Sequence, residues 1–329
     1  MTTISSTTIL RSRNAASPDK VLSTLLLRYP RCIHAEFMTH RVFSRNAASS
    51  RAIPVEKLIK DVIENPFVPV FWGLNQKGMQ ASVESDAPVY LEGASHFDMI
   101  DRCYDPISKE TAWLYARDKA VEAARAFAKA GYHKQIVNRL LEPFAHITVL
   151  VSSTEWDNFL ELRDHEAAEP HIQILAREIR KCLEREDDIQ DLEPGGWHLP
   201  FITDEDKQSV VEWDDGEENR RACSSGWVAR NQWAWYGLSK IKKLSTARCA
   251  STSYKTVDGF DMTLEKAVEL HDRLVGSSPI HASPAEHVAQ ADDFHPMQMR
   301  DGKPQGWQHP EQHGNFVGFR QYRHMLEVA

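Results

Sequence analysis

Residues 37–54, FMTHRVFSRNAASSRAIP, concentrate cationic, hydroxyl and small side chains in a short stretch of the chain. Small residues such as Ala48 and Ser49 let backbone N–H groups approach a phosphate closely, and Arg41 and Arg51 supply charge-assisted donors for its oxygens. Serine and asparagine side chains add short, neutral hydrogen-bond donors. We therefore expect this segment to bind a small anionic ligand. The alternative is a capped surface loop, because short motifs often arise by chance.

Arg163 is a second residue whose position suggests chemistry. It follows the apolar run at residues 159–162, so we expect its guanidinium to project from the end of a packed helix. A fixed cation stabilises negative charge that develops on a bound molecule. The alternative is a surface ion pair with Asp164 or Glu166, which contributes little.

Histidines gather in the last third of the chain. HASPAEH contains His281 and His287, while HPEQH sets His309 and His313 four residues apart, with His295 nearby. Such a spacing suits two zinc ligands on one helical turn. No cysteine or acidic residue completes an obvious ligand set, so we predict no metal site. The alternative for the HASPAEH histidines is a hydrogen-bonded role in a turn around its proline.

The composition limits the class of protein. With 329 residues, 42% of them hydrophobic and 26% charged, the chain resembles an ordinary soluble globular protein with a sizeable core. A formal net charge of -8 argues against a large nucleic-acid surface. No apolar run is long enough to span a bilayer and no signal peptide is evident, so we expect a cytoplasmic protein. Five scattered cysteines without a Cys-x-x-Cys pair predict reduced thiols.

Hydrophobic periodicity and cap residues predict the elements that must position these groups. We expect strands at residues 22–29 and 144–151, and helices at residues 32–41, 54–62, 108–130, 240–254, 263–275 and 314–325. Ser153 or Thr154 is expected to cap the helix that carries Arg163. The acidic, glycine-punctuated residues 203–226 are interpreted as an insertion, and residues 292–314 as a long loop.

One hexapeptide, SRNAAS, occurs twice, at residues 12–17 and 44–49. The first copy lacks the histidine and arginines that flank the second. We interpret both copies as similar loop-to-helix caps and predict no site in the first.

Three motifs together resemble the flavin-dependent thymidylate synthases. The family signature reads Arg-His-Arg, seven residues, Ser, one residue, Arg; His40, Arg41, Ser49 and Arg51 reproduce it, with Thr39 in place of the first arginine. A second block, EWDNFLELRDHEAAEPHIQILAREI, spans residues 155–179. A third block, ARCASTSY followed by HASPAEH, resembles the segment that opens the family's ordinary chain, but here it comes last.

This order of blocks implies a circularly permuted family member. The implied fold is α+β, an antiparallel sheet flanked by long helices, forming a single domain over residues 1–329. The family's N-terminal segment would be relocated to about residues 240–290. By the same resemblance the protein is expected to be a homotetramer, because the family builds each active site across subunits.

The resemblance also implies site residues. Flavin would be bound by His40, Arg41, Ser44, Asn46, Asn158 and His287. The nucleotide would be bound by Ser49, Ser50, Arg51 and Arg163, and three of these, Ser49, Arg51 and Arg163, are the predicted catalytic residues. A phosphate-binding strand arginine of the family has no clear counterpart near His146; Arg139, or Gln321 with Arg323, can take its place.

The implied reaction is methyl transfer from methylene-tetrahydrofolate to C5 of dUMP, with hydride from reduced FAD and NADPH as reductant. No enzyme nucleophile is required, and Cys249 is interpreted as a packed helix residue. Thr39, Ala47 and Ala52 depart from the family pattern, each removing a polar contact. Methylation or hydroxymethylation of another pyrimidine monophosphate such as dCMP, a non-catalytic nucleotide-binding module and a histidine-rich metal hydrolase therefore remain alternatives.

Overall fold

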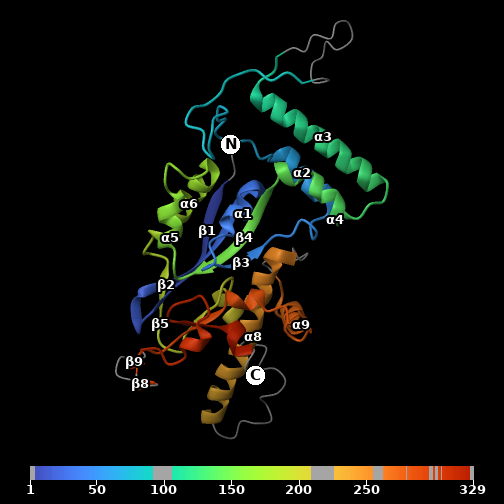
Figure 1. The fold of residues 1–329 in the computed structure, drawn as a ribbon. Coiled ribbons are helices and arrows are strands. Elements are labelled where there is room, and N and C mark those ends of the chain that lie inside the picture. Colours follow the sequence, from blue (N-terminus) through green and yellow to red (C-terminus); the bar gives the residue numbers. More distant parts are fainter. Residues whose placement is uncertain are drawn as a thin grey trace.

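A central five-stranded sheet, with strands between residues 5 and 192, organises the first part of the chain (Figure 1). The computed structural model describes residues 4–91, 106–208, 226–254, 262–278, 280–295, 299–300, 303–304 and 306–326. The sheet has the order β3-β4-β2-β1-β5. Its strands are β1 (Ser5–Asn14), β2 (Ser17–Pro30), β3 (Ser44–Ala47), β4 (His146–Ser153) and β5 (Ile189–Leu192). Neighbours are antiparallel except β1 and β5. The predicted α+β class is confirmed, while the circular permutation and the single domain stay predictions.

The two faces of this sheet differ in chemistry, because successive side chains of a strand point to opposite faces. One face is apolar and is covered by α1 (His34–Phe37), α5 (Asp157–Arg163) and α6 (Pro170–Leu183). Its buried strand residues are Leu25, Leu27, Tyr29, Ile147, Val149 and Val151. The opposite face carries Ser12, Thr24, Ser44 and Ser152, all of them buried. The register places Ser152 opposite both Thr24 and Ser44.

The C-terminal half supplies the cover for the polar face. A second, antiparallel sheet joins β6 (Trp197–His198), β7 (Ala289–Ala291) and β10 (Phe319–Gln321) in the order β10-β7-β6. Leu22 of β2 packs against Ala289 and Phe319 of this sheet. At the β3 edge of the central sheet, α8 (Gly226–Tyr254) contacts β3 and β4, and the 3₁₀ helix η5 (Ser283–Glu286) contacts β3.

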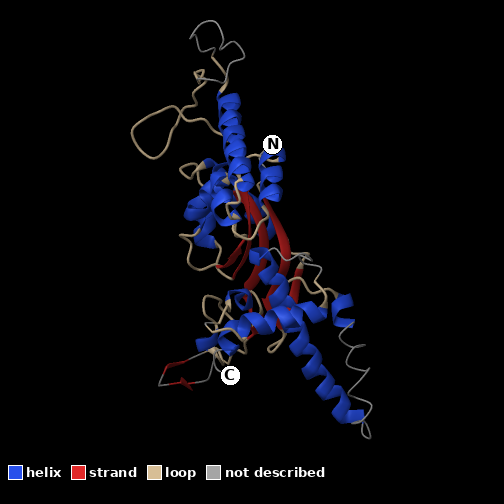
Figure 2. Ribbon diagram, turned by 90° about the vertical axis from the view of Figure 1, so that its right-hand side faces the viewer, coloured by secondary structure: helices blue, strands red, loops and turns tan. Residues whose placement is uncertain are grey.

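Several helices have the expected bounds. α2 (Val55–Glu64) follows Pro54, and α3 (Lys109–Lys129) is capped by Ser108, whose Oγ accepts from the N–H of Thr111 at 3.1 Å. Gly131, with φ +87, lies just beyond its end, in a conformation that favours glycine. α9 (Leu264–Val275) packs along α8. Figure 2 shows helices at both ends of the sheet.

Short elements connect these parts. They are η1 (Arg31–Ile33), α4 (Lys134–Val137), η2 (Asn138–Leu140), η3 (Glu142–Phe144), the hairpin β8 (Met299–Arg300) with β9 (Lys303–Pro304), η6 (Pro310–Gln312) and α10 (Tyr322–Leu326). The predicted loop at residues 292–314 therefore holds η6 and this hairpin, and residues 296–298, 301–302 and 305 lie outside the described chain.

Two helix predictions were too long. The helix expected at residues 32–41 is η1 followed by α1, which ends at Phe37. Arg45 donates to the carbonyl oxygens of Met38 and His40, 3.0 Å each. These carbonyls therefore have a hydrogen-bond donor without a further helical turn. The helix expected at residues 314–325 begins only at Tyr322, because residues 319–321 pair with β7 instead.

Two predictions about caps were wrong. Ser153 Oγ accepts from the N–H of Glu155 (3.0 Å), in a turn before α5. The N-cap residue is Trp156, whose side chain does not cap the helix but donates from Nε1 to the carbonyl of Ser153 at 3.1 Å. The two SRNAAS copies lie in strands rather than in helix caps. The first ends β1 and turns into β2, and the second forms β3.

Asp206, in the expected acidic insertion at residues 203–226, accepts from Arg248 of α8 at 2.9 Å, and residues 209–225 lie outside the described chain. In the described part of the chain, every helix is too short or too polar to cross a bilayer.

Candidate functional site

Strand β3 presents the signature segment to both faces of the sheet. It is an edge strand in the described sheet and pairs with β4 so that Ser44 lies opposite Ser152 and Asn46 opposite Leu150. Strand alternation places Ser44 and Asn46 on the polar face and Arg45 on the apolar face. Groups from either side of the sheet can therefore meet around this strand.

On the apolar side, the first and second motif blocks are in direct contact. Arg163 Nε, 123 positions further along the chain, donates to His40 Nε2 at 3.0 Å, and the same guanidinium forms an ion pair with Glu36. The ring of His40 packs edge-on against Phe159, with centroids 4.9 Å apart. Burial, and then the charges of Arg163 and Arg45, lower the pKa of His40. A neutral imidazole is thus held as an acceptor for Arg163.

On the polar side, the buried Ser44 belongs to a hydrogen-bond network with the C-terminal segment. Gln321 Nε2 donates to Ser44 Oγ at 3.1 Å and to Asn315 Oδ1 at 2.6 Å, and Asn315 Nδ2 donates to the carbonyl of Val42 at 2.8 Å. Gly314 has φ +60, and a Cβ there would lie 2.3 Å from Gln321 Oε1. The glycine therefore makes room for this contact. The structure brings the predicted residues Ser44 and Gln321 together.

His287, from the third block, reaches the same face. Its Nδ1 lies 2.8 Å from the Oγ of Ser152, the cross-strand partner of Ser44. The ring is 0% exposed, and burial lowers its pKa to about 3, so it is neutral. Nearby, Glu286 of η5 forms an ion pair with Arg323.

Two buried polar atoms at this site have no hydrogen-bond partner among the described residues. They are Nε2 of His287 and Nδ2 of Asn46, whose side chain is 3% exposed. An unmet buried donor or acceptor costs about 1–3 kcal/mol, and native proteins contain few such atoms. Both atoms belong to residues that the sequence predicts to bind flavin.

The loop after β3 is anchored by groups that the sequence did not reveal. Ser50 Oγ donates to Glu142 Oε1 at 2.7 Å, and Arg139 and Arg31 pair with the same carboxylate at 3.0 and 3.2 Å. Asn138 Nδ2 donates to the carbonyl of Ser50 at 2.7 Å. Arg139 is thus joined to Ser50 through Glu142. Nothing in the sequence indicated the role of Glu142, because Ser50 and Arg31 are far from it along the chain and a single glutamate forms no recognisable motif.

Four predicted residues lie at the surface or at its edge. Arg41, Arg51 and Asn158 are exposed, and in the described chain neither arginine forms an ion pair. Ser49 is half-buried, and its backbone N–H points to the carbonyl of Ser253 at the end of α8, 3.5 Å away. Among the described residues, no hydrogen bond or ion pair joins these side chains to His40, Ser44 or His287.

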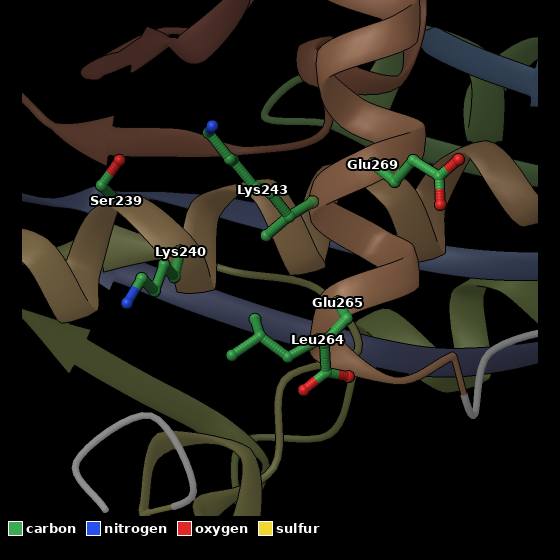
Figure 3. Close-up of a pocket in the computed structure, with 7 residues that line it drawn as sticks. Ser239, Lys240, Lys243, Leu264, Glu265 and Glu269 are labelled. Atoms are coloured by element: carbon green, nitrogen blue, oxygen red, sulfur yellow. The ribbon is translucent and has the colours of Figure 1, made fainter. Parts of the chain in front are cut away.

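Two cavities lie elsewhere. One of about 440 Å³ opens between α8 and α9 (Figure 3) and is lined by Ser239, Lys240, Lys243, Leu264, Glu265, Val268 and Glu269. Another of about 660 Å³ is lined mainly by apolar residues, among them Phe71, Trp72 and Trp113. Neither contains a predicted site residue.

The C-terminal histidines surround a carboxylate. Asp292 accepts from His309 Nδ1 at 3.0 Å and from His313 Nε2 at 2.9 Å. Burial alone would raise the pKa of Asp292, but these hydrogen bonds outweigh it and hold the pKa at about 2. Within the described ranges, no group of three or more histidine, cysteine or acidic side chains is arranged to hold a metal ion. His281 is exposed, and it does not share the setting of His287.

No family model matches the sequence, and no curated protein matches it. Among solved structures, the chain is similar to the UMP/dUMP methylase PolB from Streptomyces cacaoi, bound with 5-Br UMP, at 14% identity and a TM-score of 0.41, over 57% of this chain and 91% of that one. It is also similar to the flavin-dependent thymidylate synthase ThyX from Helicobacter pylori, complexed with FAD and dUMP, at 19% identity and a TM-score of 0.30, over 52% and 74% of the two chains. Because both TM-scores lie below 0.5, we draw neither fold nor function from these likenesses.

Proposed function

We propose that this protein catalyses a flavin-dependent methyl transfer from methylene-tetrahydrofolate to C5 of dUMP, giving dTMP. The observation that carries the proposal is the meeting of three distant motif blocks around β3. Arg163 of the second block donates to His40 of the first at 3.0 Å. His287 of the third block bonds, at 2.8 Å, the serine that faces Ser44 across the strand pair. Chance resemblance of three short motifs gives no reason for such a meeting.

The residues around β3 fit a flavin. The isoalloxazine ring carries carbonyl oxygens and ring nitrogens along one edge, and Asn46 and His287 offer buried polar atoms that have no partner in the part of the chain that the structure describes. Ser44 and Gln321 hold the neighbouring backbone in place through their hydrogen bond of 3.1 Å. FAD, when bound and kept reduced by NADPH, supplies the hydride that completes the methyl group.

The chain's own residues bind and polarise. Arg163 is fixed by Glu36 and by the neutral ring of His40, so its charge is oriented before a substrate arrives. A preoriented cation beside a pyrimidine carbonyl stabilises the negative charge that develops as C5 attacks the one-carbon unit. Arg51 and Ser49 remain accessible for the phosphate. No enzyme nucleophile is needed, and burial raises the pKa of the fully buried Cys249 thiol, which keeps it protonated and unreactive.

Exposed residues of the first two motif blocks support an assembly in which sites are shared. Arg41, Arg51 and Asn158 are exposed, as expected for groups completed by a neighbouring protomer. We therefore propose a circularly permuted homotetramer that works in the cytoplasm. Its mass in solution by light scattering tests the oligomeric state, and a monomer with full activity would contradict it.

The proposal is tested by reconstitution and product analysis. The purified full-length chain is loaded with FAD, and NADPH oxidation is followed with methylene-tetrahydrofolate and either dUMP or dCMP. We expect a yellow protein, faster NADPH oxidation with dUMP and a product with the mass of dTMP. The dCMP reaction and the product mass decide between methyl and hydroxymethyl transfer and between the two bases. Failure to retain FAD, or NADPH oxidation that ignores every nucleotide, would overturn the proposal.

A further inference from the structure

A chain of buried hydrogen bonds crosses the polar face of the central sheet and ends at His287. From the β5 side, Gln190 Nε2 donates to Ser12 Oγ at 2.8 Å, and Ser12 Oγ lies 2.7 Å from His198 Nδ1. On the far side of that ring, His198 Nε2 lies 2.8 Å from Thr24 Oγ1. The chain thus runs from an exposed side chain at one sheet edge into the interior.

The second half of the chain continues across β2 and β4. Thr24 Oγ1 lies 2.6 Å from Ser152 Oγ, and Ser152 Oγ lies 2.8 Å from His287 Nδ1. The only atom at this end without a partner among the described residues is His287 Nε2. This nitrogen lies at the end of η5, which contacts β3, where we propose that the flavin binds.

Both histidines in the chain are neutral. His198 and His287 are fully buried, and burial, the largest effect, lowers the pKa of each to about 3. Each ring therefore has one N–H, on either Nδ1 or Nε2, and the hydrogen bonds of the ring determine which nitrogen carries the proton.

The direction of the hydrogen bonds follows from the first donor. An amide N–H₂ can only donate, so Ser12 accepts from Gln190 and is free to donate its own proton to His198 Nδ1. His198 must then carry its proton on Nε2 and donate it to Thr24. Thr24 in turn donates to Ser152, and Ser152 to His287 Nδ1. In this direction every bond of the chain is formed.

The opposite direction leaves a hydroxyl proton unmet. If His287 donated from Nδ1, each bond would reverse, and Ser12 would receive from both His198 and Gln190. Both neighbours of Ser12 Oγ would then be donors, so the hydroxyl proton of this fully buried side chain would have no acceptor in the chain of hydrogen bonds. An unmet buried donor disfavours this arrangement by roughly tenfold or more.

We infer that this chain holds His287 as the Nε2–H tautomer, which presents a neutral N–H donor to a carbonyl oxygen or ring nitrogen of the bound ligand. His198 is then a positioning residue that acts on the ligand only through Thr24, Ser152 and His287. That the acceptor belongs to an imide ring, of a flavin or of a pyrimidine, rests on the proposed function. The tautomer itself does not.

The tautomer is measured directly on the full-length protein with ¹⁵N-labelled histidine. Long-range ¹H–¹⁵N correlation spectra distinguish a protonated ring nitrogen from a bare one, and His287→Gln identifies the signals of His287 by their loss. We expect His287 to be protonated at Nε2 and bare at Nδ1. The reverse pattern would overturn the inference.

Two variants test the chain from its two ends. Ser152→Ala breaks the last link and should bring His287 to a mixture of tautomers, a change of roughly tenfold in their ratio. Ser153→Ala is the matched control, because Ser153 is equally buried on the next position of β4 but faces away from the chain and bonds Glu155. An equal response to both variants would contradict the inference.

Gln190→Glu tests the direction at a distance. An ionised carboxylate can only accept, so Ser12 should donate to it, each later bond should reverse, and the proton of His287 should move toward Nδ1. Gln190 is exposed, so the fold should tolerate the change. In a Ser152→Ala background the same substitution should leave His287 unchanged. If Gln190→Glu has no effect in the otherwise unaltered protein, the chain does not set the tautomer and the inference fails.

Adding FAD alone or dUMP alone then identifies the acceptor. The ligand that shifts the Nε2 resonance of His287 is the one that receives its hydrogen bond, and no shift with either would remove His287 from the ligand site. The tautomer is read without cofactor or turnover. A wrong tautomer therefore refutes this inference alone, whereas absence of dTMP formation refutes the proposed function alone.

Discussion

The two SRNAAS copies provide a matched pair of asparagines, one structural and one that we assign to ligand binding. Asn14 and Asn46 hold the same place in the hexapeptide, both lie in strands of the central sheet, and both are buried. They differ in their partners. We predict that Asn14→Ala lowers stability and leaves flavin affinity unchanged. Asn46→Ala should leave stability nearly unchanged and weaken flavin binding.

The expected loss at Asn14 follows from its hydrogen bonds. Its Nδ2 donates to the carbonyls of Asp292 at 2.8 Å and Gly318 at 2.7 Å, and its Oδ1 accepts from the N–H of Ala16 at 2.9 Å. The Gly318 carbonyl keeps a second donor, the N–H of Asp292, at 3.0 Å. The carbonyl of Asp292 and the N–H of Ala16 lose their partners, and at roughly 1 kcal/mol each Asn14→Ala should lower the free energy of unfolding by about 2 kcal/mol.

At Asn46 the side-chain Nδ2 has no partner to lose among the described residues. Asn46→Ala should therefore change the free energy of unfolding of the FAD-free protein by less than about 1 kcal/mol. If this amide bonds the flavin, its removal costs about 1 kcal/mol of binding, which corresponds to roughly fivefold weaker FAD affinity.

Urea denaturation of the FAD-free proteins measures the first quantity, and titration of flavin fluorescence measures the second. Equal slopes with urea in the two variants are needed, so that a shifted midpoint reports stability. The reasoning is refuted if both variants lose the same stability, or if Asn46→Ala binds FAD as tightly as the unaltered protein.

Three further predictions concern two arginines and the buried histidines. Arg163→Ala should retain FAD but reduce dUMP-dependent turnover by about 10²–10³; Arg177→Ala, which breaks a surface pair with Asp164, is its control, and unchanged turnover would exclude the role of Arg163. Arg51→Ala should raise the KM for dUMP by roughly tenfold without loss of FAD; an unaltered KM would show that Arg51 does not bind the phosphate. Burial lowers the pKa of His198 and His287 from 6.5 to about 3, so the unfolded state binds more protons between these values. The free energy of unfolding should fall as the pH drops from 6.5 to 3, by up to about 1.4 kcal/mol per pH unit for each histidine, and His198→Gln should flatten the profile measured with urea.

Elements with strong local signals could be predicted from the sequence. The apolar run at residues 22–29 became part of β2, and the capping Ser108 with Gly131 gave the bounds of α3 within one residue. Short elements could not, because tertiary contacts decide them. Arg45 takes the carbonyls that would continue α1, and the pairing of residues 319–321 with β7 replaces a helical turn.

The site was predictable only in part, for a related reason. Motif resemblance selected His40, Arg163 and His287. Sequence spacing alone does not show that Arg163 is hydrogen-bonded to His40 or His287 to Ser152. His198 gave no signal at all, since its partners come from strands far away in the chain. A polar residue within an apolar strand, such as Thr24 in LSTLLLRY, was the one visible hint.

The polar face of the central sheet argues that these residues serve more than the fold. Ser12, Thr24 and Ser152 could be replaced by apolar side chains, and exchanging both partners of a buried hydrogen bond in this way is often nearly neutral for stability. Among the described residues, the side-chain atoms that form this chain instead all have partners except Nε2 of His287. An unmet buried atom beside β3 lowers stability. A network that orients a donor for a ligand must end on one, and the residue at its end is the one that the third motif block supplies.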